Sequence, residues 1–313
     1  MSTPTPIIPS DEGPTALPVP PAPVIDNVRA LVWILISVVS ASLMTIAVRQ
    51  VSLEVDSRMI VLLRAGITTL LILAALVIAS PLRRRMRFSR PVLHMFRGAL
   101  IGLSTHLGFY TISNIPLATA TVLFFMAPIF ATVFASLIHG EKVGPRRWSA
   151  VSAGFIGAVI ILRPGFSEFH PAMLTAIGSS FLFALALTLS RNLARADGVL
   201  STYFSSVVIT TIITLPIAMP VYALPVDWIT WAATAALVAT GAIRGYADTA
   251  AYHLGDAALL APVTYLRLVL ITLGGYLLFG ETPGVATITG AAIIIAATLY
   301  IAQRESRLRK MKV

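Results

Sequence analysis

One stretch of this sequence occurs twice and decides the fold. Residues 117–144 read LATATVLFFMAPIFATVFASLIHGEKVG, and residues 257–284 read AALLAPVTYLRLVLITLGGYLLFGETPG. The two stretches align without gaps at an offset of 140 residues, so that Gly140-Glu141 falls on Gly280-Glu281. In each copy an apolar run precedes the Gly-Glu pair and another apolar run follows it. We interpret the two stretches as an internal repeat rather than as a chance alignment of apolar segments.

The repeat belongs to a series of long apolar runs. Of the 313 residues, 57% are hydrophobic and 12% are charged, whereas soluble domains carry about 25% charged residues. A membrane-spanning helix needs about 20 mainly apolar residues. The sequence therefore predicts an all-α integral membrane protein with ten transmembrane helices, near residues 30–48, 59–80, 92–112, 117–138, 148–162, 171–190, 200–222, 228–249, 258–279 and 285–302.

These helices divide into two units of five, at residues 29–165 and 166–303. Because five is odd, the second unit enters the membrane upside down relative to the first. Such inverted repeats are typical of secondary transporters, whose substrate site lies near the membrane midplane between the halves. The flanking segments differ in composition: residues 1–28 are proline-rich and predict a disordered tail, and residues 304–313 form a basic tail.

Basic residues between the helices predict the orientation. Alternate connections and the C-terminal tail carry fifteen basic residues, namely Arg83, Arg84, Arg85, Arg87, Arg90, Lys142, Arg146, Arg147, Arg191, Arg195, Arg304, Arg307, Arg309, Lys310 and Lys312. The other connections hold few. Because basic loops stay in the cytoplasm, we expect a multi-pass protein of a bacterial-type inner membrane with both termini cytoplasmic. Topology thus explains the net charge of +10, and no nucleic-acid partner is expected.

The repeated segments resemble those of the drug/metabolite transporter superfamily, of the ten-helix EamA type. The resemblance covers nearly everything after residue 28. It rests on Pro116-Leu117-Ala118, Leu123-Phe124-Phe125, Pro128, Gly140-Glu141, Arg146-Arg147-Trp148 and Arg163-Pro164-Gly165, and on Tyr265-Leu266-Arg267-Leu268, Gly274 and Leu277-Leu278-Phe279-Gly280-Glu281. The two copies differ at one of these positions, where the first has Pro128 and the second has Leu268.

The resemblance implies alternating access around a central cavity lined mainly by helices other than the fifth and tenth. It implies a small organic metabolite as substrate, with riboflavin, S-adenosylmethionine and amino acids among the candidates. The partners expected are this substrate, the lipid bilayer and, as a candidate coupling ion, the proton. No cofactor or metal is expected, and a chain without cysteine has no disulfide and no thiolate metal site.

Charged residues inside apolar runs are the first candidates for substrate contacts, because a charge at the bilayer centre is costly unless it faces water or a partner. Arg267 lies about 14 Å into the predicted ninth helix, next to Tyr265. It either contacts substrate or forms an internal ion pair. Arg244 and Asp248 are spaced i,i+4, so they form a gate, a substrate anchor or simply an internal pair.

Other candidates are weaker. His106 is either a proton relay or a histidine hydrogen-bonded to a neighbouring helix. Tyr110, Phe124 and Tyr246 are candidate aromatic walls of the substrate site. Arg64 lies about two turns from the end of its predicted helix, where it is expected to snorkel to the interface.

Two other function classes compete with a transporter. An intramembrane enzyme needs a nucleophile with a base or paired carboxylates within reach, and Asp248 and Asp256 lack the glycines that flank an intramembrane aspartyl protease. We therefore expect no enzymatic activity. A receptor or structural membrane protein would leave the two-repeat pattern unexplained.

Overall fold

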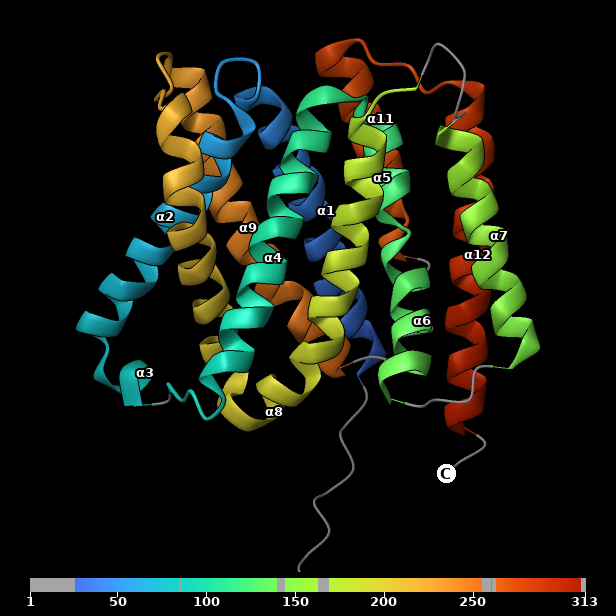
Figure 1. The fold of residues 1–313 in the computed structure, drawn as a ribbon, viewed down its shortest axis with the longest axis horizontal. Coiled ribbons are helices and arrows are strands. Elements are labelled where there is room, and N and C mark those ends of the chain that lie inside the picture. Colours follow the sequence, from blue (N-terminus) through green and yellow to red (C-terminus); the bar gives the residue numbers. More distant parts are fainter. Residues whose placement is uncertain are drawn as a thin grey trace, which may run out of the picture.

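The computed structural model describes residues 26–84, 86–139, 144–162, 169–254, 260 and 263–310. Most of the proline-rich segment, Gly140-Glu141, Asp256 and the Arg163-Pro164-Gly165 motif lie outside these described residues. Within them the chain forms helices and no strand (Figure 1). The prediction of an all-α fold is confirmed for this part of the chain.

The helices follow one another through short connections. They are α1 (Asn27–Val51), α2 (Ser57–Ile78), α3 (Ser80–Arg84), α4 (Pro91–Asn114), α5 (Leu117–Phe124), α6 (Ala127–His139), α7 (Pro145–Leu162), α8 (Ala172–Ala218), the 3-10 turn η1 (Met219–Val221), α9 (Trp228–Leu254), α11 (Leu266–Phe279) and α12 (Val285–Lys310).

Two predicted helices are each interrupted near the middle. The run at 117–138 divides into α5 and α6, and Pro128 is the second residue of α6. Proline suits the first turn of a helix, where its missing N–H is no loss. The run at 258–279 has its turn at Tyr265, directly before α11. In this second copy Leu268 stands at the position that matches Pro128, and the proline of the run, Pro262, precedes the turn instead.

Two other predicted helices, 171–190 and 200–222, are joined. They form the single helical run α8, which bends at Gly198. This residue has φ 85° and ψ 159°, a conformation open essentially to glycine alone. Because the segment before it is rich in alanine, leucine and arginine, which favour helix, the chain stays helical where a loop was predicted.

The surface and the interior have the distribution expected of a membrane protein. Five helical stretches of the described residues are long and apolar enough to span a membrane, at Val28–Val51, Ser57–Ile78, Leu117–Ile138, Ala172–Leu189 and Ala196–Val221. Large apolar side chains such as Val77, Ile78 and Val92 are more than three-quarters exposed. Many serine and threonine side chains are buried instead, which is how membrane helices join through hydrogen bonds.

The helices pack in long pairs. α4 lies along α8, α1 along α9, and α7 along α12. The α7–α12 contact depends on two glycines, since a Cβ on Gly290 would lie 2.7 Å from the carbonyl oxygen of Gly157. A Cβ on Gly98 would meet Ile209 of α8 at 2.6 Å. These glycines allow the close approach that small residues give to helices in membranes.

The two ends of the bundle differ in charge. The start of α1, the short helix α3 and the end of α12 lie at one end (Figure 1). We call it the basic end, because it carries Arg83, Arg84, Arg87 and Arg90. The other is the opposite end.

Candidate functional site

A cluster of charged side chains lies between α1, α2, α9 and α11. Arg267, the second residue of α11, directs its Nη2 to the hydroxyl of Thr45 on α1 at 3.1 Å. Its Nε is buried and has no hydrogen-bond partner among the described residues. This arginine is therefore only partly satisfied by the protein.

The carboxylate of Asp248 contacts two neighbouring side chains. The Ser37 hydroxyl of α1 donates to Oδ1. Nε of Arg244 lies 3.6 Å from Oδ2, so the i,i+4 pair that the sequence allowed is present. Asp248 thus holds α9 against α1.

The prediction for Arg64 was wrong. Instead of reaching the interface, its guanidinium lies over the ring of Phe109, 5.7 Å from the centroid. Its Nε lies 3.4 Å from the position that a Cβ on Gly241 would occupy. The side chain turns inward because glycine leaves room for it on α9. We call Arg64, Arg244, Asp248 and Arg267, with Ser37 and Thr45, the central cluster.

The predicted aromatic walls divide into inner and outer groups. Tyr265 contacts Phe125 edge-on, with ring centroids 4.9 Å apart, and Phe124 packs against two of the hydrophobic cores. Tyr110 and Tyr246 are 40% and 68% exposed, so they lie largely on the outer surface. The structure therefore keeps Tyr265 and Phe124 in the interior and leaves Tyr110 and Tyr246 outside the central cluster.

His106 joins two helices. Its Nε2 lies 2.9 Å from the hydroxyl of Thr214, which connects α4 to α8. This contact is the helix-bridging hydrogen bond that the sequence analysis weighed against a proton relay.

An ion pair ties the helices together at the opposite end. Nη2 of Arg49 lies 3.0 Å from Oε1 of Glu281, and Nη1 donates to the carbonyls of Ile112 and Ser113 at the end of α4. The other oxygen, Oε2, accepts the backbone N–H of Leu117 at 2.7 Å. A carboxylate is favourable there, because the start of α5 is the positive end of its helix dipole. We call these contacts the opposite-end clasp.

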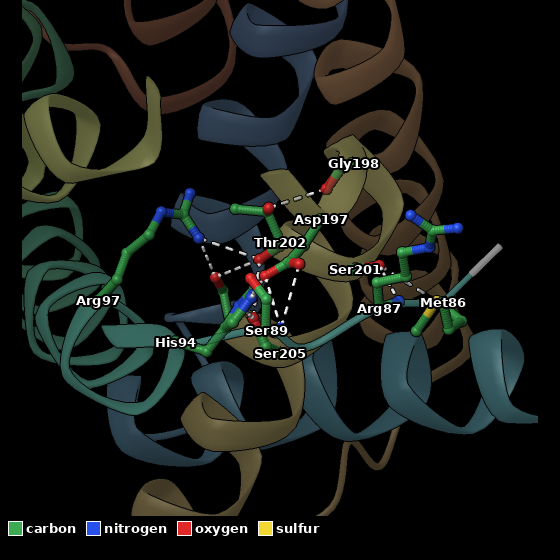
Figure 2. A network of polar contacts seen from close by, with 11 residues as sticks. Met86, Arg87, Ser89, His94, Arg97, Asp197, Gly198, Ser201, Thr202 and Ser205 are labelled. Atoms are coloured by element: carbon green, nitrogen blue, oxygen red, sulfur yellow. Dashed lines mark hydrogen bonds and ion pairs between the residues drawn. The ribbon is translucent and has the colours of Figure 1, made fainter. Parts of the chain in front are cut away.

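A second polar network lies near the basic end, where α4 meets the bend of α8 (Figure 2). Nε2 of His94 lies 2.9 Å from the carboxylate of Asp197, and Nδ1 lies 2.8 Å from the Ser205 hydroxyl. The backbone N–H of Ser89 donates to both Asp197 oxygens at 3.1 Å. Arg97 donates to the Thr202 carbonyl and to the Ser206 hydroxyl. We call these contacts the basic-end network.

Sequence reasoning missed most of these two groups. Glu281 was noticed only as part of the repeated Gly-Glu pair, and Asp197 lies in a stretch that was predicted to be a basic loop. His94 and Asp197 are 103 residues apart. No local spacing signals such a pair, and only the packing of α4 on α8 brings them together.

Comparisons with known proteins agree with this architecture. Residues 28–163 match the model of the EamA-like transporter family. An S-adenosylmethionine uptake transporter of Rickettsia prowazekii is 28% identical over 91% of this chain and 96% of its own. A riboflavin transporter of Brucella anthropi is 30% identical over 78% of this chain and 91% of its own.

One crystal structure has the same fold. Its chain is 22% identical to this one and gives a TM-score of 0.61, covering 90% of this chain and 99% of the other. The family match, the transporter relatives and the apolar helices show that the protein is a multi-pass membrane protein. The chain belongs to the EamA-like transporter family, within the drug/metabolite transporter superfamily.

Proposed function

We propose that this chain is a secondary transporter that moves a small organic metabolite by alternating access. The proposal includes ten transmembrane helices in two inverted repeats, at residues 29–165 and 166–303. The substrate binds between the repeats, near the central cluster, and the two ends of the bundle open in turn.

The observation that carries the proposal is a pair of matched interruptions. Helix α5 ends at Phe124, and the turn at Phe125 precedes α6. The turn at Tyr265 precedes α11, and it lies 140 residues further along, at the offset of the sequence repeat. The rings of Phe125 and Tyr265 are in contact. Discontinuous helices that meet between the repeats are the usual setting of a transporter substrate site.

Helix pairing supports the same relation. In the repeat, α1 corresponds to the first part of α8, and α4 corresponds to α9. The contact of α1 with α9 therefore has its counterpart in the contact of α8 with α4. Because α7 of the first half corresponds to α12 of the second half, the contact between these two helices is its own counterpart. This set of contacts is what a two-fold relation between the halves requires.

Transport of labelled compounds into proteoliposomes tests the function. The names of the relatives make S-adenosylmethionine and riboflavin the first compounds to try, followed by amino acids. We expect time-dependent accumulation or exchange of at least one compound. Liposomes in which the protein has a single orientation, loaded inside or outside, separate uptake from export. Binding of a compound without any flux would contradict alternating access and favour a receptor.

Orientation is tested by thiol labelling, which is clean because the chain has no cysteine. Leu53→Cys lies in the connection between α1 and α2 at the opposite end, where Leu53 is 65% exposed. Leu82→Cys lies in α3, at the basic end. We expect an impermeant reagent to label the first variant in intact cells and the second only after lysis. The reverse pattern would contradict cytoplasmic termini in an inner membrane.

Proton coupling is the remaining part of the proposal. If His106 relays the proton, His106→Gln abolishes the response of uptake to a pH gradient but leaves exchange of substrate. Since glutamine still bonds to Thr214, the helix contact is kept. Unchanged pH-driven accumulation would leave His106 with the structural role alone.

A further inference from the structure

The central cluster carries more positive charge than its own residues neutralise, and we infer that it binds the carboxylate group of the transported substrate. This inference deepens the proposed function and rests on it. It selects one class of metabolite, small organic acids and amino acids, and disfavours cargos that have no anionic group.

The first argument is the balance of charge. Arg64, Arg244 and Arg267 lie within electrostatic range of one another through Arg244, and Asp248 is the carboxylate among them. Within the described residues the cluster thus has three guanidinium groups for one carboxylate. Uncompensated charge in a membrane interior is expensive, so a bound anion would improve the charge balance of these described residues.

The second argument is that Asp248 cannot serve all three arginines. Its oxygens are engaged by Ser37 and Arg244. Arg64 has an aromatic ring beneath it, and Arg267 has one hydroxyl partner and a buried Nε that donates to no described atom. Among the described residues, Arg244 is the cluster arginine within ion-pair distance of Asp248. Arg267 interacts with the same carboxylate at longer range, so this one carboxylate does not balance the charges of Arg64 and Arg267 as well.

The third argument is the position of Arg267 in its helix. It is the second residue of α11, no side chain caps this helix start, and its first turn has no acidic residue. The start of a helix is the positive end of its dipole, which repels a cation and attracts an anion. An arginine there is stabilised only if an anion lies close to it.

Arginines elsewhere in the protein show the contrast. Arg49 at the opposite end has Glu281 and two backbone carbonyls, and Arg97 near the basic end has a carbonyl and a hydroxyl. These residues have structural partners that α11 does not supply to Arg267. Nε of Arg49 is also buried without a hydrogen-bond partner among the described residues. Its guanidinium nevertheless faces the carboxylate of Glu281, whereas that of Arg267 faces one hydroxyl.

The ligand chemistry follows from these donors. A carboxylate accepts two parallel N–H bonds from one guanidinium and more from a second. Thr45, on the same helix as Ser37, offers a further hydroxyl next to Arg267. S-adenosylmethionine and free amino acids carry such a carboxylate, whereas riboflavin does not.

Matched compound pairs test the inference directly. Binding to the purified full chain in detergent is measured by calorimetry for S-adenosylmethionine against its decarboxylated form, methionine against methioninol, and tryptophan against tryptamine, with riboflavin as the neutral probe. We expect at least one acid to bind and its partner without the carboxylate to bind about 10–150-fold more weakly. Arg267→Lys should weaken binding of the acid by a similar factor, because lysine cannot donate two parallel hydrogen bonds as a guanidinium does.

Two variants control for folding and for general charge. Arg267→Gln removes the charge, and thermal unfolding without ligand shows whether the protein is folded. Arg58→Gln removes an exposed arginine that pairs with Asp56 at the opposite end, and it should leave acid binding unchanged. Loss of binding in Arg58→Gln as well would overturn a site-specific role for Arg267.

The remaining outcomes separate the inference from the proposed function. Equal binding of both members of each pair, or binding of riboflavin alone, would overturn the carboxylate site. If the compound that binds is also transported, the proposed function still stands. Chloride or phosphate binding without any acid would assign the cluster to an inorganic ion. Failure of all three acids to bind overturns the inference, and failure of every compound to be transported counts against the function itself.

Discussion

The two ends of the bundle are joined by polar contacts of different kinds. At the opposite end a guanidinium, which is always charged, pairs with Glu281, and the two side chains are 21% and 12% exposed. Near the basic end an imidazole pairs with Asp197, and these side chains are 3% and 1% exposed. Both sets of contacts join residues of the first half to residues of the second. Each carboxylate also follows or precedes a glycine of positive φ, Gly280 or Gly198.

The difference suggests how easily each end separates. The opposite-end clasp attaches to backbone groups at helix ends, the carbonyls of α4 and the first amide of α5. Such contacts are replaced by water when the helices move apart. The basic-end network is enclosed between α4 and α8 (Figure 2), so separating these helices exposes a buried histidine and its partners. We therefore expect the opposite end to open at a smaller cost.

The largest effect is expected from His94→Ala. This change removes a buried ring that also packs edge-on against Phe88 at 5.3 Å, and it leaves Asp197 and Ser205 without their imidazole partner. A loss of about 3–5 kcal/mol in the free energy of unfolding is expected for such a deletion. Chemical unfolding of the detergent-solubilised protein measures it.

His170→Ala is the matched control. This second histidine, before α8, accepts one hydrogen bond from the Ala172 amide. Its removal should cost about 1 kcal/mol, as for a lost helix cap. Similar losses in the two variants would mean that the basic-end network contributes no more than an ordinary cap.

Glu281→Gln is expected to have an intermediate effect. The amide still accepts the Leu117 N–H but leaves Arg49 without its counter-charge, a loss of about 1.5–3 kcal/mol for charge-assisted bonds. In a Thr119→Cys background the thiol reports opening, since Thr119 is 5% exposed and bonds to Thr287 across α5 and α12. Labelling from the opposite end should become about tenfold faster or more.

Glu54→Gln controls for charge at the same end. Glu54 accepts a hydrogen bond from the Val226 amide in an exposed contact, so its change should leave labelling at position 119 nearly constant. If Glu281→Gln labels no faster than this control, the clasp does not hold the end closed.

The sequence predicted the helices well because each is a long apolar run, and membrane spans require such runs. The interruptions were harder. Pro128 follows the turn before α6, whereas at the matched turn Leu268 stands in that place and the proline, Pro262, lies before Tyr265. The bend at Gly198 depends on one glycine in a segment that otherwise favours helix. Tertiary contacts, rather than local preference, determine these positions.

The candidate site was predicted in part for a related reason. A charged residue inside an apolar run is visible in the sequence, which is how Arg267 and the Arg244–Asp248 pair were found. The direction of Arg64 was not visible, because it depends on the space that Gly241 leaves on another helix. Ser37 and Thr45 were missed since serine and threonine are common in membrane helices and only their partners distinguish them.

The smallest effects should come from the two glycines, and they sharpen the comparison of the ends. Gly198 has φ 85° and ψ 159°, where a side chain costs about 2 kcal/mol, whereas Gly280 has φ 66° and ψ 19°, where the cost is about 1 kcal/mol. Gly198→Ala should therefore lower stability more than Gly280→Ala, measured by the same unfolding experiment. Gly66→Ala, in a helix with nothing within 4 Å of the added Cβ, should cause no loss. Equal effects at Gly198 and Gly280 would show that the bend of α8 relaxes without strain, and that Asp197 is held by the packing of α4 rather than by the backbone beside it.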